Sequence, residues 1–304
     1  MAHEAIPASR RQFLGAAGGA LALGQPSEAP VALPKVKFGR HELTRLVIGS
    51  NPLYGYSHFN PLLNKLMEEW MTPERRVQVL LQAERAGINT WQVHYNDPTI
   101  EDLKRYRDAG GKMNWLLLAD FELQKNWKLL PLVAKLGAIG VAHHGNRTDE
   151  RFRAGQMDIV RDFTKAVHDA GLPAGVSCHN PAVVEYIEEH GWQIDYYMTC
   201  MYRVSRTREE IRKELGEAPL GEVYMEKDPE RMCRVVRQTR KTCFAFKLLG
   251  AGRNINRPEQ VEAAVRFVLT NIKPQDAVIV GMFPKFKDEI RENAELVRRI
   301  SAAV

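Results

Sequence analysis

Histidines stand at the ends of three short apolar runs of this chain. One run reads IGVAHHG and ends on His143 and His144, and comparable runs end at His94 and His179. A fourth run, with three leucines at its centre, ends at Asp120. Neutral imidazoles and a carboxylate are ligands suited to Zn, Mn, Fe or Ni. The pattern therefore predicts a divalent metal site if the runs are neighbouring strands, and separately hydrogen-bonded histidines if they are not.

Three further residues near the ends of apolar runs are candidates for proton transfer: Glu122, Lys247 and Tyr202. A lysine at the rim of an apolar strand can act as a general base or form a Schiff base. It can equally bind phosphate or carboxylate, or balance the charge of Asp120. The ring-rich segment 54–60, YGYSHFN, is either a lid that stacks on sugar faces or an apolar patch that closes the fold.

A repeated unit of helix, glycine-containing turn and apolar strand is expected to position these residues. Continuous rather than alternating apolar runs are typical of parallel strands covered by helices. We expect strands at residues 46–49, 88–94, 115–120, 139–144, 174–179, 194–200, 243–249 and 277–281. We expect helices at 72–86, 99–109, 126–136, 157–170, 181–190, 229–241, 258–271 and 285–302. Eight such units predict an α/β fold, a closed (β/α)8 TIM barrel with its site at the C-terminal strand ends.

Strand geometry restricts which of these side chains can meet. Side chains alternate across a strand, so Ser177 and His179 share a face, whereas only one of His143 and His144 can point into the barrel. No GxGxxG sequence follows an early strand, which disfavours a Rossmann domain. The sequence therefore predicts one barrel domain over residues 31–304.

Composition limits the partners of the chain. The net charge of +6 comes from scattered Lys and Arg, without a basic block interleaved with aromatic residues, so we expect no nucleic-acid partner. The four cysteines show no CxxC spacing and are expected to be free thiols. A small-molecule substrate, such as a carbohydrate, is the expected partner.

Residues 1–30 resemble a twin-arginine export signal. Arg10 and Arg11 precede Phe13 and a weakly apolar run rich in Gly and Ala, followed by a zone of small residues. The run is too short to span a membrane, so we expect no integral membrane segment. The pattern predicts export to the periplasm or the exterior, and a disordered basic tail is the alternative.

Four stretches together resemble the aldo/keto reductase superfamily. FGRHELTRLVIGSN is similar to its N-terminal hairpin and first strand, and AGINTWQVHYND to its second strand. AGVSCHNPAVVEYI is similar to its fifth strand, and VIVGMFPKFKDEIRENAELV to its last strand and the following helix. The resemblance spans nearly the whole chain after residue 30. It implies a TIM barrel with an N-terminal β-hairpin and ancestry in NADP-dependent carbonyl reduction.

The catalytic positions depart from the pattern of that family. Gln92 stands in place of its Asp, Asp97 in place of its Tyr proton donor, and Asp120 in place of its Lys. Its histidine is kept as His143 or His144. Reduction needs a tyrosine acid whose pKa a lysine lowers, so these replacements remove the donor and reverse the local charge. Asp97 is then a candidate acid in its own right.

The resemblance also implies which residues would bind NADP. They are Ser177 on the fifth strand, and Lys285, Arg291 and Asn293 around the last helix. In a divergent reductase, Tyr95 or Tyr202 would replace the missing donor.

Our leading hypothesis is an exported barrel enzyme that performs metal-assisted lyase, isomerase or hydrolase chemistry on a sugar-like or polyol substrate. The alternative is an NADP-dependent oxidoreductase, and the third possibility is a non-catalytic binding protein.

Overall fold

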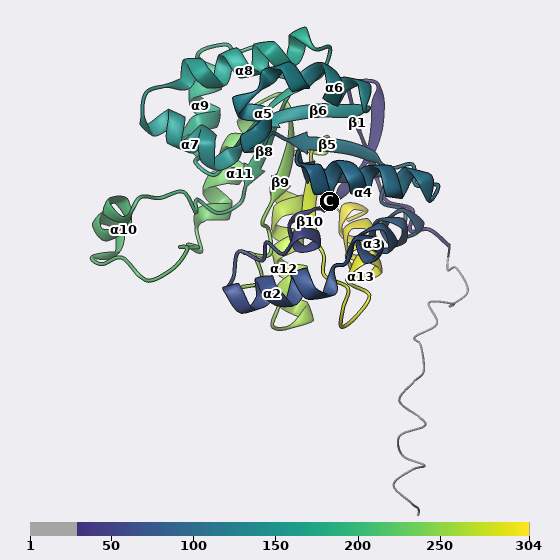
Figure 1. The fold of residues 1–304 in the computed structure, drawn as a ribbon. Coiled ribbons are helices and arrows are strands. Elements are labelled where there is room, and N and C mark those ends of the chain that lie inside the picture. Colours follow the sequence, from purple (N-terminus) through teal and green to yellow (C-terminus); the bar gives the residue numbers. More distant parts are fainter. Residues whose placement is uncertain (1–28, 304) are drawn as a thin grey trace, which may run out of the picture.

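Eight parallel strands close into a barrel, which confirms the predicted (β/α)8 TIM-barrel fold (Figure 1). The structure, a computed structural model, describes residues 29–303 apart from the side chains of residues 121 and 122. Neighbouring strands follow chain order, and the last strand pairs with the first to close the sheet. The barrel strands are β3 Leu46–Gly49, β4 Thr90–His94, β5 Asn114–Leu118, β6 Ala138–His143, β7 Ala174–Cys178, β8 Tyr196–Cys200, β9 Thr242–Phe246 and β10 Ala277–Gly281.

Helices between the strands surround the barrel (Figure 1). Thr72 caps one of them by accepting a hydrogen bond from the Arg75 amide, with Pro73 at the first helical position as the sequence predicts. The helices are α2 Pro61–Trp70, α3 Pro73–Arg85, α4 Asp97–Asp108, α5 Phe121–Lys125, α6 Leu130–Lys135, α7 Gly145–Arg153, α8 Met157–Asp169, α9 Pro181–Glu189, α10 Arg208–Leu215, α11 Asp228–Gln238, α12 Pro258–Asn271 and α13 Glu289–Ser301, with short 3₁₀ helices η1 Asn51–Tyr54 and η2 Trp127–Leu129.

An antiparallel hairpin, β1 (Lys35–Phe38) and β2 (His41–Thr44), packs on the N-terminal end of the barrel. The Phe38 ring meets Tyr196 and Phe244 edge-on, with centroids 5.1 and 5.5 Å away. Tyr196 begins β8, so the hairpin closes the end at which the strands start. The opposite end, where the strands finish, is left for a site.

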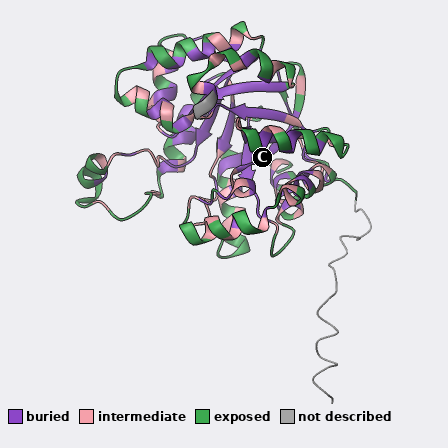
Figure 2. Cartoon of the chain, in the orientation of Figure 1, coloured by how far each residue is buried: buried purple, intermediate pink, exposed green. Residues whose placement is uncertain are grey.

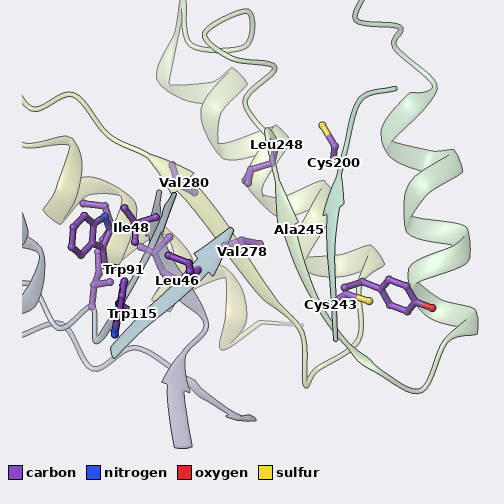
Figure 3. Close-up of a cluster of buried hydrophobic side chains, with 14 of the residues drawn as sticks. Leu46, Ile48, Trp91, Trp115, Cys200, Cys243, Ala245, Leu248, Val278 and Val280 are labelled. Atoms are coloured by element: carbon purple, nitrogen blue, oxygen red, sulfur yellow. The ribbon is translucent and has the colours of Figure 1, made fainter. Parts of the chain in front are cut away.

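The strands are buried on both faces, as their continuous apolar sequences predict. Inside the barrel, Val47, Leu116 and Met198 pack with the hairpin. Between strands and helices lies a second cluster that includes Ile48 and Trp91 (Figure 3). Exposed residues are confined mainly to the outer helix faces and loops (Figure 2).

Four helices were not expected from the sequence: α2, α5, α7 and α10. The sequences of α7 (GNRTDERFR) and α10 (REEIRKEL) are strongly charged, so apolar spacing gives little signal for them. Helix α10 belongs to the insertion 201–227, which extends away from the barrel (Figure 1). Predicted β3, α12 and β10 have the observed bounds, and the other boundaries shift by a few residues.

Some predictions concern the chain as a whole. Cys178, Cys200, Cys233 and Cys243 are free and buried, as expected. Over the described residues, no helix is both long and apolar enough to cross a bilayer. The predicted export motif at Arg10 and Arg11 lies outside the described residues.

Candidate functional site

His94 and His144 lie together at the C-terminal end of the barrel, with ring centroids 5.9 Å apart. Burial and, after it, the nearby His94 lower the pKa of His144 to about 4. Burial also lowers the pKa of His94, an effect that the charge of Asp120 opposes. Both rings are therefore neutral at pH 7, and Asp120 is close enough to act on both.

His143 is turned away from this pair. Its Nδ1 lies 2.8 Å from Thr148 Oγ1 on α7, and its ring packs edge-on against Phe163 on α8 with centroids 5.3 Å apart. Burial in this helix layer lowers the pKa of His143 to about 3. Strand alternation allows only one of the two neighbours at the barrel mouth, and that one is His144. His143 therefore cannot serve as one of the predicted metal ligands at the barrel mouth.

His179 is held by a buried carboxylate. Its Nδ1 lies 2.9 Å from Asp149 Oδ2, and the side chains of the two residues are 7% and 1% exposed. The same carboxylate accepts hydrogen bonds from the backbone amides of His179, at 3.0 Å, and Asn180, at 3.2 Å. These contacts fix the ring and leave Nε2 as the nitrogen available to a ligand.

Gly145 fixes the same ring from the start of α7. A Cβ atom at this position would lie 2.9 Å from His179 Cε1 and 3.0 Å from Ser177 Oγ. The helix can therefore approach β7 this closely only because residue 145 has no side chain. Ser177 and His179 share a face of their strand, as predicted.

A second group of charged side chains surrounds Lys247, which follows β9. Burial lowers the pKa of Lys247, while nearby Glu222 opposes the shift. His58 Nδ1 lies 3.5 Å from Glu222 Oε1. Partial burial raises the pKa of Glu222, but the His58 hydrogen bond and the charge of Lys247 outweigh it and lower that pKa to about 2. His58 also lowers the pKa of His94, so the two groups adjoin.

A cavity of about 700 Å³ opens beside Lys247. Its wall includes His58, Gln92 and Lys247 at the barrel mouth and reaches Asn293 on α13. The exposed rings of Tyr56 and Phe286 also line it. This volume falls in the range of small-molecule sites, which lie at this end of TIM barrels.

Backbone strain is concentrated around this cavity. Within the described residues, the non-glycine residues with positive φ are His58 (53°), Lys247 (58°) and Ala251 (50°). All three line the cavity. A left-handed conformation costs a residue with a side chain about 1 to 2 kcal/mol, so the surrounding structure must hold these positions. Such strain is typical of binding and catalytic sites.

Two of the expected catalytic residues do not line the cavity. Asp97 is exposed at the first position of α4. Tyr202 is buried, and its hydroxyl accepts a hydrogen bond from Asn254 Nδ2 at 2.9 Å. The side chain of Glu122 lies outside the described residues. Of the four expected catalytic residues, Lys247 therefore has the clearest place in the site.

The residues expected to bind NADP are dispersed. Asn293 lines the cavity, although its Nδ2 donates to the Glu289 carbonyl within α13 at 2.7 Å. Arg291 pairs with Glu295 at 3.0 Å, and Lys285 is exposed. The buried Ser177 lies beside Gly145.

The expected metal ligands do not converge. Within the described part of the chain, no three His, Cys, Asp or Glu side chains come close enough together to hold a metal ion. His143 is turned away, and His179 Nδ1 is engaged by Asp149. The residues as placed do not fit the expected ligand set, and a bound divalent metal stays a prediction for elemental analysis.

Asp149 and Glu222 were missed from the sequence. Asp149 lies in a charged helix without apolar spacing, and Glu222 lies in the long insertion, far along the chain from His58. His58 itself was noticed only as part of the ring-rich segment. A buried aspartate gives no sequence signal of its own, because its burial depends on the packing of α7 against β7.

Comparisons with known proteins support the fold. No protein-family profile matches the chain, and no curated protein sequence matches it. Among solved structures, the apo form of Gox0644 aligns with a TM-score of 0.50 and 11% identity, over 88% of this chain and 94% of that one. A truncated 3-deoxy-D-arabino-heptulosonate 7-phosphate synthase from Thermotoga maritima aligns with a TM-score of 0.49 and 14% identity, over 89% and 92% of the two chains.

A xylose isomerase-like TIM barrel protein from Mycobacterium smegmatis, in complex with magnesium, aligns with a TM-score of 0.45 and 12% identity, over 76% of this chain and 90% of that one. At 11% identity, the likeness to Gox0644 shows the fold alone. The resemblance to aldo/keto reductases stays a prediction from sequence. Function must be argued from the site itself.

Proposed function

We propose that the chain is an enzyme that moves a proton next to the carbonyl group of a small polyhydroxylated compound, as lyases and isomerases of sugars do. The Asp149–His179 pair carries this proposal. A carboxylate on Nδ1 selects the tautomer in which Nε2 accepts a proton, and it stabilises the imidazolium that forms. Because both side chains are almost fully buried, their geometry is fixed before substrate binds.

His94 and His144 are suited to bind the oxygen on which negative charge develops. Their lowered pKa values keep the rings neutral at pH 7, so each has one N–H that can donate a hydrogen bond without a positive charge. His144 Nδ1 is buried and has no hydrogen-bond partner in the described chain. We assign the base to His179 and the oxygen-binding role to this pair.

The cavity favours a sugar-sized compound. Gln92 and Lys247 offer polar groups at its inner end, while Tyr56 and Phe286 are 56% and 74% exposed at its rim. Aromatic faces stack on the apolar C–H faces of sugars, and a volume of about 700 Å³ exceeds what a triose fills.

Hydrogen exchange tests the proposal whatever product the reaction forms. The protein is incubated in deuterium oxide with dihydroxyacetone, glyceraldehyde, erythrose, fructose or glucose, and loss of the proton next to the carbonyl is followed by proton NMR. We expect catalysed exchange for at least one compound and its loss in His179→Ala. The matched control is His190→Ala, an exposed histidine at the end of α9. Absence of exchange with every compound, or wild-type exchange by His179→Ala, would contradict the proposal.

NADP-dependent carbonyl reduction is the second candidate. The cavity reaches Asn293 on the helix that the resemblance assigns to the nucleotide, which is the observation in its favour. Lys285 and Arg291 would then bind the nucleotide phosphate, and Tyr95 or Tyr202 would be the proton donor. Quenching of NADPH fluorescence at micromolar concentration would favour this candidate. A protein without exchange activity or nucleotide binding would fit the non-catalytic alternative.

Export is a separate proposal that rests on Arg10, Arg11 and the apolar run after them. A full-length chain with both arginines replaced by lysine is expected to stay in the cytoplasm, while the natural sequence is exported. Equal export of both chains would contradict it.

A further inference from the structure

Three lysines place their ammonium groups beside the barrel strands, and two of them are paired. Lys241 Nζ lies 2.7 Å from Glu188 Oε1, and Lys273 Nζ lies 3.0 Å from Asp276 Oδ2. Lys247 is also mostly buried, yet among the described side chains none lies within ion-pair distance of its Nζ. Lys247 therefore differs from the lysines that stabilise the fold.

Lys247 carries two unfavourable free-energy terms, one from burial of its ammonium group and one from its backbone conformation. An ammonium group that leaves water without a close partner is costly, and the neutral amine is favoured in response. The backbone φ of 58° adds a strain that glycine would avoid. Neither cost stabilises the fold, and both fall on a residue that lines the cavity. Costs of this kind at one residue are typical of a functional position.

We propose that Lys247 forms an imine with the carbonyl carbon of the compound that occupies the 700 Å³ cavity. The inference deepens the proposed function and rests on it for the class of compound, a small polyhydroxylated aldehyde or ketone. His58 and Gln92 line the same cavity as Lys247, and the Glu222 carboxylate lies beside His58.

The step balances without an oxidant or reductant. In its neutral form Nζ attacks the carbonyl carbon, the C–N bond forms, and the carbonyl electron pair moves to oxygen. A proton passes from nitrogen to that oxygen, for which His58 is the carrier. A second proton, taken up from solvent through His58, converts the hydroxyl to a leaving water. The C–O bond breaks, water leaves with the bonding pair, and an iminium remains, so the step consumes one proton overall.

Glu222 suits this step because its pKa of about 2 keeps the carboxylate ionised, and its charge acts on the Lys247 nitrogen without forming an ion pair with it. The iminium in turn withdraws electrons from the neighbouring carbon. The proton on that carbon becomes more acidic, and His179 is the base that we assign to remove it. Its ring packs edge-on against Phe246, which lines the cavity, with centroids 5.7 Å apart.

Two probes test Lys247 directly in the full-length protein. Sodium borohydride with dihydroxyacetone reduces an imine to a stable amine. Acetylacetone forms an enaminone with a nucleophilic amine and needs no turnover. We expect each probe to add one adduct per chain, which peptide mapping by mass spectrometry assigns to Lys247. Lys241 and Lys273 are the internal controls, because ion pairs with Glu188 and Asp276 engage their Nζ atoms.

Lys247→Arg keeps the charge, cannot form an imine, and is expected to give no adduct. His179→Ala is expected to keep the adduct. Adducts spread over surface lysines without preference for Lys247 would overturn the inference. An adduct on Lys247 without deuterium exchange would support the imine and contradict the proposed function. Deuterium exchange without an adduct would support the proposed function and contradict the imine.

Lys247→Gly tests the argument from strain. We expect its thermal unfolding midpoint to rise by about 1 to 3 °C, because glycine adopts the left-handed conformation freely. A fall in the midpoint would show that the lysine stabilises the fold, and would overturn the assignment of its strain to function.

Discussion

Two carboxylates that precede strands at the N-terminal end of the barrel, Asp276 and Asp195, are fully paired, whereas several buried polar groups at the C-terminal end have no partner. Asp276 accepts hydrogen bonds from the amides of Cys243 and Lys273, both at 2.8 Å, and pairs with Lys273 Nζ at 3.0 Å. Asp195 accepts from the Ala174 amide and lies 2.7 Å from His168 Nε2. At the C-terminal end, buried polar atoms without a partner in the described residues are Ser50 Oγ, Gln92 Nε2, His144 Nδ1, Ser177 Oγ and Thr199 Oγ1.

This difference indicates that the two ends of the barrel have different roles, one in stability and the other in function. Buried groups in a folded protein are normally hydrogen-bonded, so a cluster of unpaired ones needs a partner from water or a ligand. In TIM barrels the N-terminal end supports the fold and the C-terminal end carries the chemistry. The closed end, sealed by the hairpin, thus stabilises a barrel whose open end has unpaired and strained groups.

The largest effect is expected at the open end, from Asp149→Asn. The amide cannot hold His179 in the tautomer that leaves Nε2 as an acceptor, so we expect deuterium exchange to fall by about 1,000- to 10,000-fold. Exchange rates of the purified variant measure this. Glu150→Gln, one residue along the same helix and exposed, is the matched control. A loss below about tenfold would separate Asp149 from the chemistry.

At the closed end, Asp276→Ala is expected to lower the free energy of unfolding by about 3 to 5 kcal/mol. The change leaves two buried amides and the Lys273 ammonium without their acceptor. His144→Ala at the open end is expected to change stability by less than about 1 kcal/mol, because it removes a buried atom that already has no partner. Urea unfolding followed by tryptophan fluorescence compares the two. Equal losses would contradict the division between the ends.

The barrel was predictable because its signal is repeated. Eight continuous apolar runs, with a helix and a turn before every run but the first, leave few other folds. The strands at residues 46–49 and 277–281 have the predicted bounds. Alternation along a strand also predicted that only one of His143 and His144 faces the mouth. It could not say which, because the register depends on how β6 packs against α8.

The site was less predictable because it depends on contacts between distant segments. Asp149 meets His179 across 30 positions of the chain, and Glu222 meets His58 across a far longer separation. Spacing along one element says nothing of such pairs. The same reason explains the metal prediction: three strands end in histidine, but the side chains take different directions and partners.

The pH dependence of stability sharpens the comparison further. His143 and His144 have pKa values of about 3 and about 4, below the ordinary value of 6.5. Below pH 6.5, these two histidines are therefore protonated in the unfolded chain but stay neutral in the folded chain until the pH approaches their lowered pKa values. Stability is complete above that pH and falls as pH decreases, by about 1.4 kcal/mol per pH unit for each histidine. Between pH 4.5 and 8, the free energy of unfolding of His143→Gln should depend on pH less steeply than that of the natural protein, by the equivalent of about one bound proton. An unchanged slope would contradict this prediction.

The smallest effects come from two glycines, and they separate close packing from backbone strain. In Gly145→Ala the new Cβ would lie 2.9 Å from His179 Cε1, so the ring must shift by a few tenths of an ångström while Asp149 holds Nδ1. We expect exchange to fall about tenfold, with stability changed by less than about 1 kcal/mol, since helical alanine offsets part of the crowding. Gly155→Ala meets no atom within 4 Å but has a φ of 66°, so it should lose about 1 kcal/mol and keep its exchange activity. If both variants lost activity in proportion to stability, Gly145 would serve the fold alone and the fixed position of His179 would have no functional consequence.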